Sequence, residues 1–540
     1  METATTQAPQ LISPLWRSRL ATAVAALPVL VAGVRAAASS WVPIGDDAYF
    51  TARSMDVATD HHPLLGAWSS GSTGLSRQVN SLGPLQLDLL APFTKVAPMG
   101  GTAIGVVSVH IAAIATIAWL VRRVAGHRAV LPAMAAVAVL AWILGSEMLI
   151  AARQHQYLVL PYLCVLVAAW AATAGDRWAL VPFVAAGSLV TQTHLSYPIL
   201  VAGLAIPVIA GQVNAARQRG LAEFVRPWGI AVIGSAVLWL QTGIDQVAGW
   251  GNLAAALSSP GEANGPGLNS GFRIVAHVVT AARGYVRPGF GNWQPDVGVA
   301  GDVRMTLFLM TLGALVMAFV VAVGQRRRVA ASGLVVAVTA LVAAVIDAAS
   351  LPISQLGLMG FSPANFRWLW STTAFLLLGG FVAVAHYASV ATEAGRRASA
   401  VGFAVVLAVV TVANLPASQQ VTAPDRYREQ LRLTAEMTQQ LHDVDLSGPV
   451  VIDQSHVFFG HPFGYPIVVV LRERGIEYRL EGPMQERRFG ESRVAEGTEP
   501  ERLVLWSGDE ALARQDAPNS VVYVEGDDPL VVLLETMGAG

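Results

Sequence analysis

The sequence predicts an α-helical polytopic membrane protein that carries a small external α/β domain at its C-terminal end. Of its 540 residues, 54% are hydrophobic and only 13% are charged, about half the charged fraction of a typical soluble protein. The apolar residues form blocks of the roughly 20 residues that a helix needs to cross a bilayer. Charged residues become frequent only in the tail, after about residue 415. The net charge of -1 gives no reason to expect a nucleic-acid partner.

About eleven apolar stretches are predicted to be membrane spans. They lie near residues 20–39, 102–121, 129–149, 157–173, 178–192, 197–212, 228–243, 304–324, 330–349, 366–386 and 399–415. The polar N-terminus followed by the first stretch is similar to a secretory signal. We interpret it as preceding a retained span, because no small-residue cleavage site leads into a soluble domain.

Arginine clusters in the connections between spans predict the orientation of the protein. They occur at Arg17 and Arg19, Arg122–Arg128, Arg177, Arg217–Arg226, Arg326–Arg328 and Arg396–Arg397, which all fall on one side of the membrane. Basic loops stay in the cytoplasm, so loops 40–101 and 244–303 and the tail are predicted to be external. Abundant Ala, Val, Gly and Arg with scarce Lys indicate a high-GC bacterium such as an actinobacterium, and hence a plasma-membrane location.

Two domains follow from this division. Residues 1–415 are predicted to form the transmembrane domain, and residues 416–540 an external soluble domain. In the tail, alternating apolar runs near 449–452, 502–506 and 520–524 predict strands, and helices are expected near 427–441 and 465–474. A re-entrant or interfacial helix is expected at 85–94 in the first long loop, and a short helix near 271–283 in the second.

The sharpest motif is the carboxylate pair Asp46-Asp47, in the sequence Gly-Asp-Asp-Ala-Tyr that follows the first span. Adjacent carboxylates raise each other's pKa and are costly to keep beside a membrane. Capping of a helix is the structural alternative, because Asp is common at an N-cap, but one Asp would be sufficient for that. The pair therefore predicts acid–base chemistry.

Cationic and imidazole side chains in the predicted external loops are candidates for binding an anionic headgroup. They are Arg53, His61, His62, Arg153, His155, His194 and Arg367. A guanidinium group binds phosphate through two parallel hydrogen bonds. Interfacial anchoring is the alternative for the arginines, since Arg, Trp and Tyr are common at the membrane face, and a polar contact between helices is the alternative for His194.

The adjacent residues His61 and His62 leave a divalent metal site open. Neighbouring histidines point in different directions, and no acidic partner at helical spacing is evident, so a polar turn before Pro63 is the alternative. The single cysteine, Cys164, lies in an apolar run and excludes a disulfide or a cysteine metal cluster within the chain. No cofactor is predicted with certainty.

The motif at residues 45–49, the many spans and the external C-terminal domain together resemble the GT-C superfamily of polytopic membrane glycosyltransferases. The resemblance implies a polyprenyl-phosphate-linked sugar as donor, a glycan or lipid-linked acceptor, and an active site on the outer face. The actinobacterial arabinofuranosyltransferases that use decaprenyl-phospho-arabinose are similar in general plan, which makes arabinofuranose the best prediction. By this analogy Asp46 or Asp47 is the acid–base residue, and basic residues hold the donor phosphate.

The resemblance leaves the sugar and the acceptor open. The tail has only about 125 residues and lacks the large carbohydrate-binding modules of some of those enzymes. A flippase or transporter for lipid-linked sugars is the alternative function. Charged residues are scarce inside the predicted spans, which disfavours a transporter, and a flippase has no need of an external domain.

Overall fold

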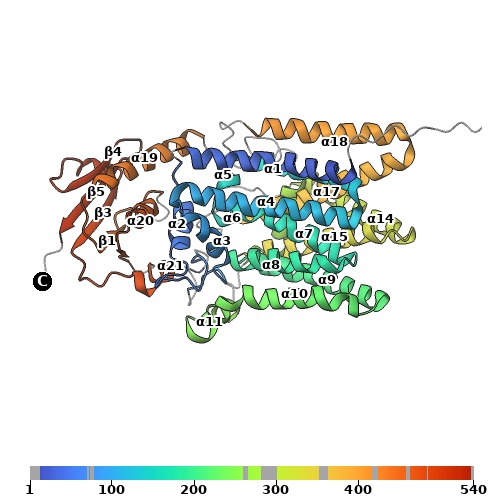
Figure 1. Cartoon of the computed structure of the whole chain (residues 1–540), viewed down its shortest axis with the longest axis horizontal. Coiled ribbons are helices and arrows are strands. Elements are labelled where there is room, and N and C mark those ends of the chain that lie inside the picture. Colours follow the sequence, from blue (N-terminus) through green and yellow to red (C-terminus); the bar gives the residue numbers. More distant parts are fainter. Residues whose placement is uncertain are drawn as a thin grey trace, which may run out of the picture.

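The computed structural model describes residues 13–39, 41–69, 72, 78–258, 265–280, 301–351, 363–415, 424–457, 462–482 and 485–536. Long helices lie roughly side by side in a bundle, and a sheet domain built from the C-terminal part of the chain sits at one end of it (Figure 1). The chain is thus a multi-pass membrane protein with a small C-terminal α/β domain, as predicted. The predicted boundary at residue 415 adjoins a segment outside the described residues.

Eleven helices in the described part of the chain overlap the eleven predicted spans. They are α1 (Pro14–Ala38), α4 (Pro98–Ala125), α5 (His127–Ile150), α7 (Val159–Thr173), α8 (Leu180–Thr193), α9 (Tyr197–Arg219), α10 (Ala222–Leu238), α14 (Asp302–Gly324), α15 (Arg328–Ser350), α17 (Trp368–Ala391) and α18 (Glu393–Ala413). Nine helices of the described chain are long and apolar enough to cross a membrane, with the short α6 (Gln154–Tyr157) counted as part of the α7 span.

Two of the eleven depart from a simple span. Helix α10 reaches the required length only together with α11 (Leu240–Ala248), from which it is bent by 44°. Helix α8 has 14 residues, or about 21 Å at 1.5 Å per residue, which is short of a bilayer core of about 30 Å. The prediction of a full span at 178–192 is therefore wrong by this measure. The predicted stretch itself has only 15 residues, and a 3₁₀ turn, η2 (Arg177–Ala179), occupies the first two of them.

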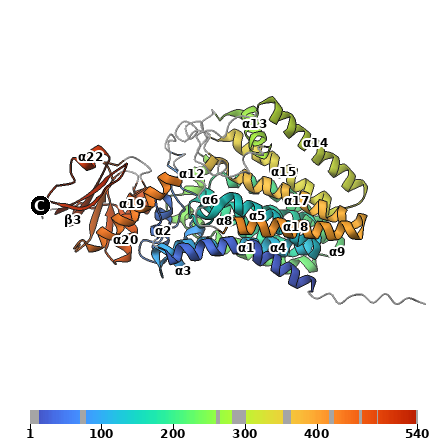
Figure 2. The same ribbon diagram turned by 90° about the horizontal axis from the view of Figure 1, so that it is seen from above.

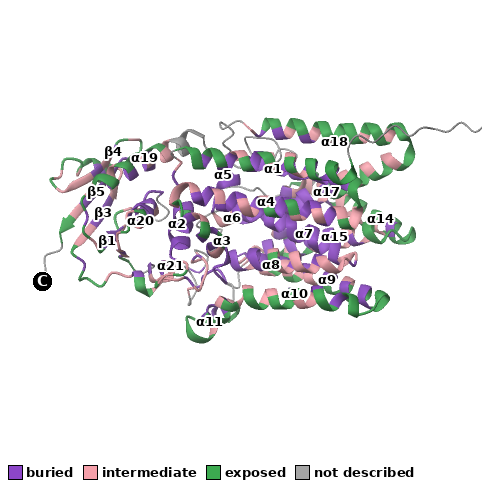
Figure 3. Ribbon diagram, viewed as in Figure 1, coloured by how far each residue is buried: buried purple, intermediate pink, exposed green. Residues whose placement is uncertain are grey.

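Burial separates the centre of the bundle from its lipid-facing surface. Helix α7 is buried along nearly its whole length and packs against α4, α8, α9, α15 and α17. In contrast, α14 and α18 expose large apolar side chains such as Met317 and Val409, as expected of surfaces that meet lipid. Figure 3 shows this buried centre around α7 with exposed outer helices, and Figure 2 shows α14 at one edge of the bundle.

The connections at the sheet-domain end of the bundle form short helices. The first long loop contains α2 (Asp46–Met55) and α3 (Leu85–Thr94), and α3 has the bounds predicted for the interfacial helix. The second contains α12 (Asn252–Ser258) and α13 (Gly267–Thr280), close to the predicted helix near 271–283. The segments 259–264 and 281–300, which hold much of the Pro- and Gly-rich sequence of this loop, lie outside the described residues.

The C-terminal domain is a five-stranded mixed sheet with helices. Its elements are α19 (Pro424–Asp443), β1 (Val450–Asp453), α20 (Gly464–Glu473), β2 (Tyr478–Leu480), α21 (Gln485–Phe489), η5 (Glu491–Arg493), β3 (Glu501–Ser507), α22 (Asp509–Leu512), β4 (Ser520–Val524) and β5 (Leu530–Thr536). The strand order is β2-β1-β3-β5-β4, with β1 parallel to β2 and β3 and the other pairs antiparallel. The three predicted strands and both helices are present, whereas β2 and β5 were not predicted.

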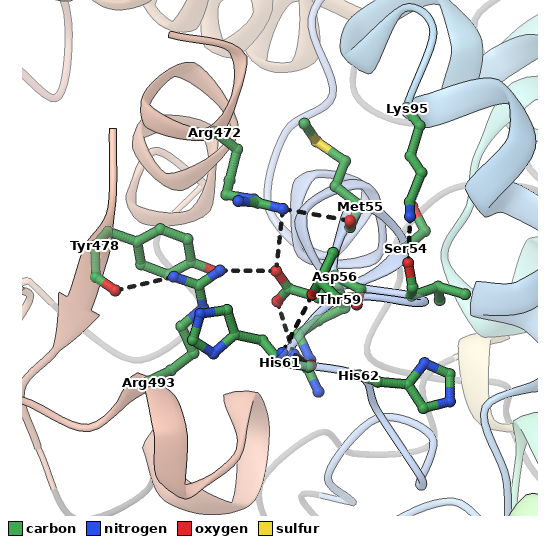
Figure 4. Close-up of polar contacts among 12 residues, drawn as sticks. Ser54, Met55, Asp56, Thr59, His61, His62, Lys95, Arg472, Tyr478 and Arg493 are labelled. Atoms are coloured by element: carbon green, nitrogen blue, oxygen red, sulfur yellow. Dashed lines mark hydrogen bonds and ion pairs between the residues drawn. The ribbon is translucent and has the colours of Figure 1, made fainter. Parts of the chain in front are cut away.

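A buried ion cluster around Asp56 fixes this domain to the first loop (Figure 4). The Asp56 carboxylate is inaccessible to solvent and lies 2.8 Å from Arg53, 2.8 Å from Arg493 and 3.5 Å from Arg472. Two of these three arginines belong to the C-terminal domain. The neighbouring His61 bridges to the same domain, with Nδ1 2.7 Å from the Ser492 hydroxyl.

The arrangement generates a prediction about orientation. In intact cells, an impermeant thiol reagent should label cysteines at Asp60→Cys and Asp509→Cys but not at Arg327→Cys, because basic loops stay inside. Asp60, Asp509 and Arg327 are all exposed, while the native Cys164 is buried and should stay silent. The reverse labelling pattern would place the C-terminal domain in the cytoplasm.

A second prediction concerns the ion cluster. Asp56→Asn should weaken docking of the C-terminal domain by about 3–5 kcal/mol, because it leaves buried guanidinium groups without their counter-charge. The measurement is the rate of limited proteolysis between the two parts, together with the thermal unfolding midpoint. Asp60→Asn, an exposed carboxylate four residues on, is the matched control. Equal proteolysis of both variants and wild type would show that docking does not depend on Asp56.

Candidate functional site

The two carboxylates of the acidic motif open helix α2 but face different surroundings. Gly45, with a φ of 52°, turns the chain into the helix, and its N–H donates to the carbonyl of Pro462 (2.9 Å). Consecutive helical residues point about 100° apart, so the side chains separate: Asp46 is exposed, while Asp47 is 1% exposed. Both sit at a helix N-terminus, where the helix dipole favours negative charge.

Asp47 is held by a single arginine. One of its carboxylate oxygens accepts from the Arg153 backbone N–H (2.9 Å), and the other accepts from the Arg153 Nε–H (3.1 Å). The Arg153 Nη2 lies 3.9 Å from Glu147, which follows a break in α5 at Gly145 (φ 73°). Both carboxylate oxygens of Asp47 are therefore engaged in hydrogen bonds, and these bonds hold Arg153 and its guanidinium group in place.

Asp46 is the open member of the pair. It makes no hydrogen bond or ion pair with any residue in the described part of the chain, although protein surrounds it on most sides. Burial raises the pKa of its carboxyl above the ordinary 3.8; the charge of Arg153 opposes this rise, Asp47 adds to it, and Arg488 opposes it. Asp46 is thus placed to accept a proton from a group that reaches this surface.

Arg367 supplies a second cation close to Arg153. It lies just before α17, is 2% exposed, and its guanidinium packs over the ring of Trp370 at 5.4 Å. Its Nε and Nη1 have no hydrogen-bond partner within the described residues. Arg153 is within electrostatic range of this group. Two neighbouring cations, one with unused donors, suit a bound anion such as a phosphate.

Two of the four predicted site histidines come together beside these arginines. The rings of His155 and His194 lie 4.7 Å apart, and that of Tyr197 lies 6.0 Å from His194. His194 Nδ1 accepts from the Ser196 backbone N–H (3.2 Å). Burial lowers the pKa of His194 to about 4, so this imidazole is neutral at ordinary pH and adds no positive charge.

The structure thus gathers six of the nine predicted site residues at the sheet-domain end of the bundle, namely Asp46, Asp47, Arg153, His155, His194 and Arg367. It places the other three elsewhere in the first loop. Arg53 and His61 belong to the contacts of the C-terminal domain, and His62 accepts from the Ala58 backbone N–H (2.9 Å) and points away from Asp56 in Figure 4. No role for these three in binding a headgroup follows from their positions.

No metal centre is formed by the parts of the chain that the structure describes. In those parts, no group of three or more His, Cys, Asp or Glu side chains is placed to hold a metal ion. His61 lies 3.1 Å from Glu477, whereas His62 faces its own turn. The two histidines do not act together.

Two residues of the C-terminal domain reach the site without having been predicted. Arg488 donates to the hydroxyl of Tyr465 (2.8 Å), its carbonyl accepts from Tyr49 (2.9 Å), and its guanidinium lies over the ring of Trp68 at 4.9 Å. Tyr465 in turn packs against Tyr49 with ring centroids 5.4 Å apart. Nothing local in the sequence marks either residue, because their partners in the first loop lie more than 400 positions away.

Comparison with solved structures identifies the fold. The crystal structure of ArnT from Cupriavidus metallidurans bound to undecaprenyl phosphate matches with a TM-score of 0.52 at 13% identity, over 94% of this chain and 97% of ArnT. The apo form matches with a TM-score of 0.51 at 14% identity, over 96% and 98%. No family model matches the chain, and no curated protein matches it significantly. The chain therefore has the ArnT-like GT-C fold over almost its whole length, which confirms the predicted fold class.

Proposed function

We propose that the protein is a membrane glycosyltransferase that moves a sugar from a polyprenyl-phosphate donor to a glycan or lipid-linked acceptor on the external face of a bacterial plasma membrane. Arabinofuranose is the first candidate for the sugar. The observation that carries the proposal is the open carboxylate of Asp46 beside Arg153, within a GT-C fold. The solved ArnT complex, which contains undecaprenyl phosphate, supports a donor of this class.

We assign distinct chemical tasks to the two sides of the site on the basis of their geometry. Asp46 is the base that takes the proton of the acceptor hydroxyl while the new bond to the sugar carbon forms. The bond from that carbon to the phosphate oxygen breaks, and negative charge builds on the departing phosphate. Arg153 and Arg367 stabilise this charge, since preorganised cations lower the barrier where charge develops.

Asp47 acts through Arg153. Because it holds that guanidinium through Nε and through the backbone, it fixes the direction in which the remaining donors point. It is a positioning residue, and Asp46 is the catalytic one. This division follows from their exposure, since a base must be reachable by the acceptor.

The main test compares Asp46→Asn with Asp47→Asn. Loss of a general base costs about 10²–10⁴ in rate, so Asp46→Asn should nearly abolish turnover and leave the KM for donor close to wild type. Asp47→Asn should instead raise the KM, because Arg153 is released. Transfer from radiolabelled decaprenyl-phospho-arabinose, with the mannose analogue in parallel, measures both. Asp60→Asn is the control.

Near-normal transfer by both variants would remove the main support for a glycosyltransferase. Movement of the lipid-linked sugar across vesicles without any transfer would favour a flippase instead.

The raised pKa of Asp46 predicts the pH dependence of the reaction. A base works only when deprotonated, so kcat/KM should fall as the pH drops through a pKa that lies above the ordinary 3.8. Arg488 lowers this pKa, hence Arg488→Gln should move the acidic limb to higher pH. Arg487→Gln is the matched control, because the Arg487 side chain bonds to the carbonyl of Gln78 instead (2.8 Å). If the acidic limb of the Arg488→Gln profile stays at the wild-type pH, the group that titrates in this limb is not Asp46.

A further inference from the structure

Asp347 is a buried acid inside a membrane span that the proposed reaction does not use. It lies on the inward face of α15, in a stripe whose neighbouring members are the small apolar residues Ala340, Ala343, Ala344 and Ala348. The residue is 3% exposed, and its Oδ2 has no hydrogen-bond partner among the residues that the structure describes. Ionisable groups within spans are costly and rarely idle.

Asp347 lies at the same end of the helix bundle as the candidate site. It lies three residues before the end of α15, while Tyr162 lies three residues after the start of α7 and Tyr197 is the first residue of α9. At 1.5 Å per residue, each is within about 5 Å of its helix end. Helix α15 packs directly against α7 and α9, so these ends meet beside Arg367.

Tyr197 connects Asp347 to the phosphate side of the site. Its ring lies 5.2 Å from the ring of Tyr162, edge to face. Both Asp347 and Arg367 are within electrostatic range of its hydroxyl. A polar path therefore runs from the carboxylate, past a phenol, to the buried guanidinium.

Unused hydrogen-bonding atoms of both kinds gather at these converging helix ends. Donors remain on Arg367 (Nε and Nη1) and on Asn365 (Nδ2), and an acceptor remains on Asp347 (Oδ2), within the described chain. A buried polar atom without a partner costs about 1–3 kcal/mol. An anion alone would satisfy the donors but would repel the carboxylate. A ligand that carries both a phosphate and hydroxyl groups would satisfy the unused donors and the unused acceptor.

We propose that Asp347 accepts a hydrogen bond from a hydroxyl group of the sugar headgroup of the lipid-linked donor, with Tyr197 beside the same headgroup. Arg367 and Asn365 face the phosphate to which this sugar is attached. The proposal rests on the proposed function and adds the part of the site that distinguishes a glycosylated lipid from the bare lipid phosphate. Asp347 is thus a specificity residue for the donor.

The test measures lipid binding to the full-length protein in nanodiscs. The probes are decaprenyl phosphate, decaprenyl-phospho-arabinofuranose and decaprenyl-phospho-mannose. Asp347→Asn should weaken the better-bound glycosylated lipid roughly 10-fold, because an amide oxygen accepts a weaker hydrogen bond than a carboxylate does. Its affinity for bare decaprenyl phosphate should stay within about twofold of wild type, because Asp347 does not touch the phosphate. Arg367→Gln should weaken all three lipids.

Two further variants keep the test decisive. Ser332 lies on the same buried face of α15, away from the site. Ser332→Ala is therefore the control and should change the affinity for none of the three lipids. Tyr197→Phe removes only a hydroxyl and should selectively weaken the glycosylated lipid; it replaces Asp347→Asn if that variant does not fold. The thermal midpoint of Asp347→Asn should not fall, because the amide is close in size to the carboxyl group and adds no buried charge.

The outcomes separate this inference from the proposed function. Equal weakening of bare and glycosylated lipid by Asp347→Asn, or no effect on either, would overturn the sugar subsite. Wild-type protein that binds decaprenyl phosphate but prefers neither glycosylated lipid would also overturn it and leave the phosphate site standing. Wild-type protein that binds none of the three lipids would remove the proposed donor and the subsite with it.

Discussion

The burial of the Asp56 carboxylate among three guanidinium groups is the interaction on which the relation between the two parts of the molecule depends. A buried carboxylate is tolerated only with close partners, and two of the three come from the C-terminal domain; that of Arg493 is 437 positions away in the sequence. Helix α20 packs along α2 as a result. The same packing sets Tyr465 against Tyr49 and brings Arg488 near Asp46. The surroundings of Asp46, the proposed base, therefore depend on a contact at the other end of α2.

Much of the fold could be predicted because a bilayer imposes a local constraint of length and hydrophobicity on each span. The stretch at α8 is apolar enough for a span but too short for one, because its 15 residues fall below the roughly 20 that a bilayer requires. Strand β2 could not be predicted for another reason. It has three residues and is a strand only through its pairing with β1, in which Val450 faces Tyr478. A pattern within the segment cannot encode a partner that lies elsewhere in the chain.

The site was predictable where charge stands out against an apolar background. Asp46, Asp47, Arg153 and Arg367 lie near the ends of long apolar stretches, and the alternation of basic loops indicates that those ends share one side. His61 and His62 stand out in the sequence only by residue type, and type does not determine which way a loop side chain points. His61 contacts Ser492 of the C-terminal domain instead.

The acidic pair shows how one helical turn can hold two carboxylates in different states. Because successive side chains diverge by about 100°, Asp47 is buried against Arg153 with both oxygens engaged, and Asp46 is left open. Burial by the surrounding protein raises the pKa of Asp46; the charge of Arg153 limits this rise, and the charge of Asp47 adds to it. A single Asp could not both anchor the arginine and remain free to take a proton. In the proposed reaction the pair therefore serves two tasks that require opposite surroundings.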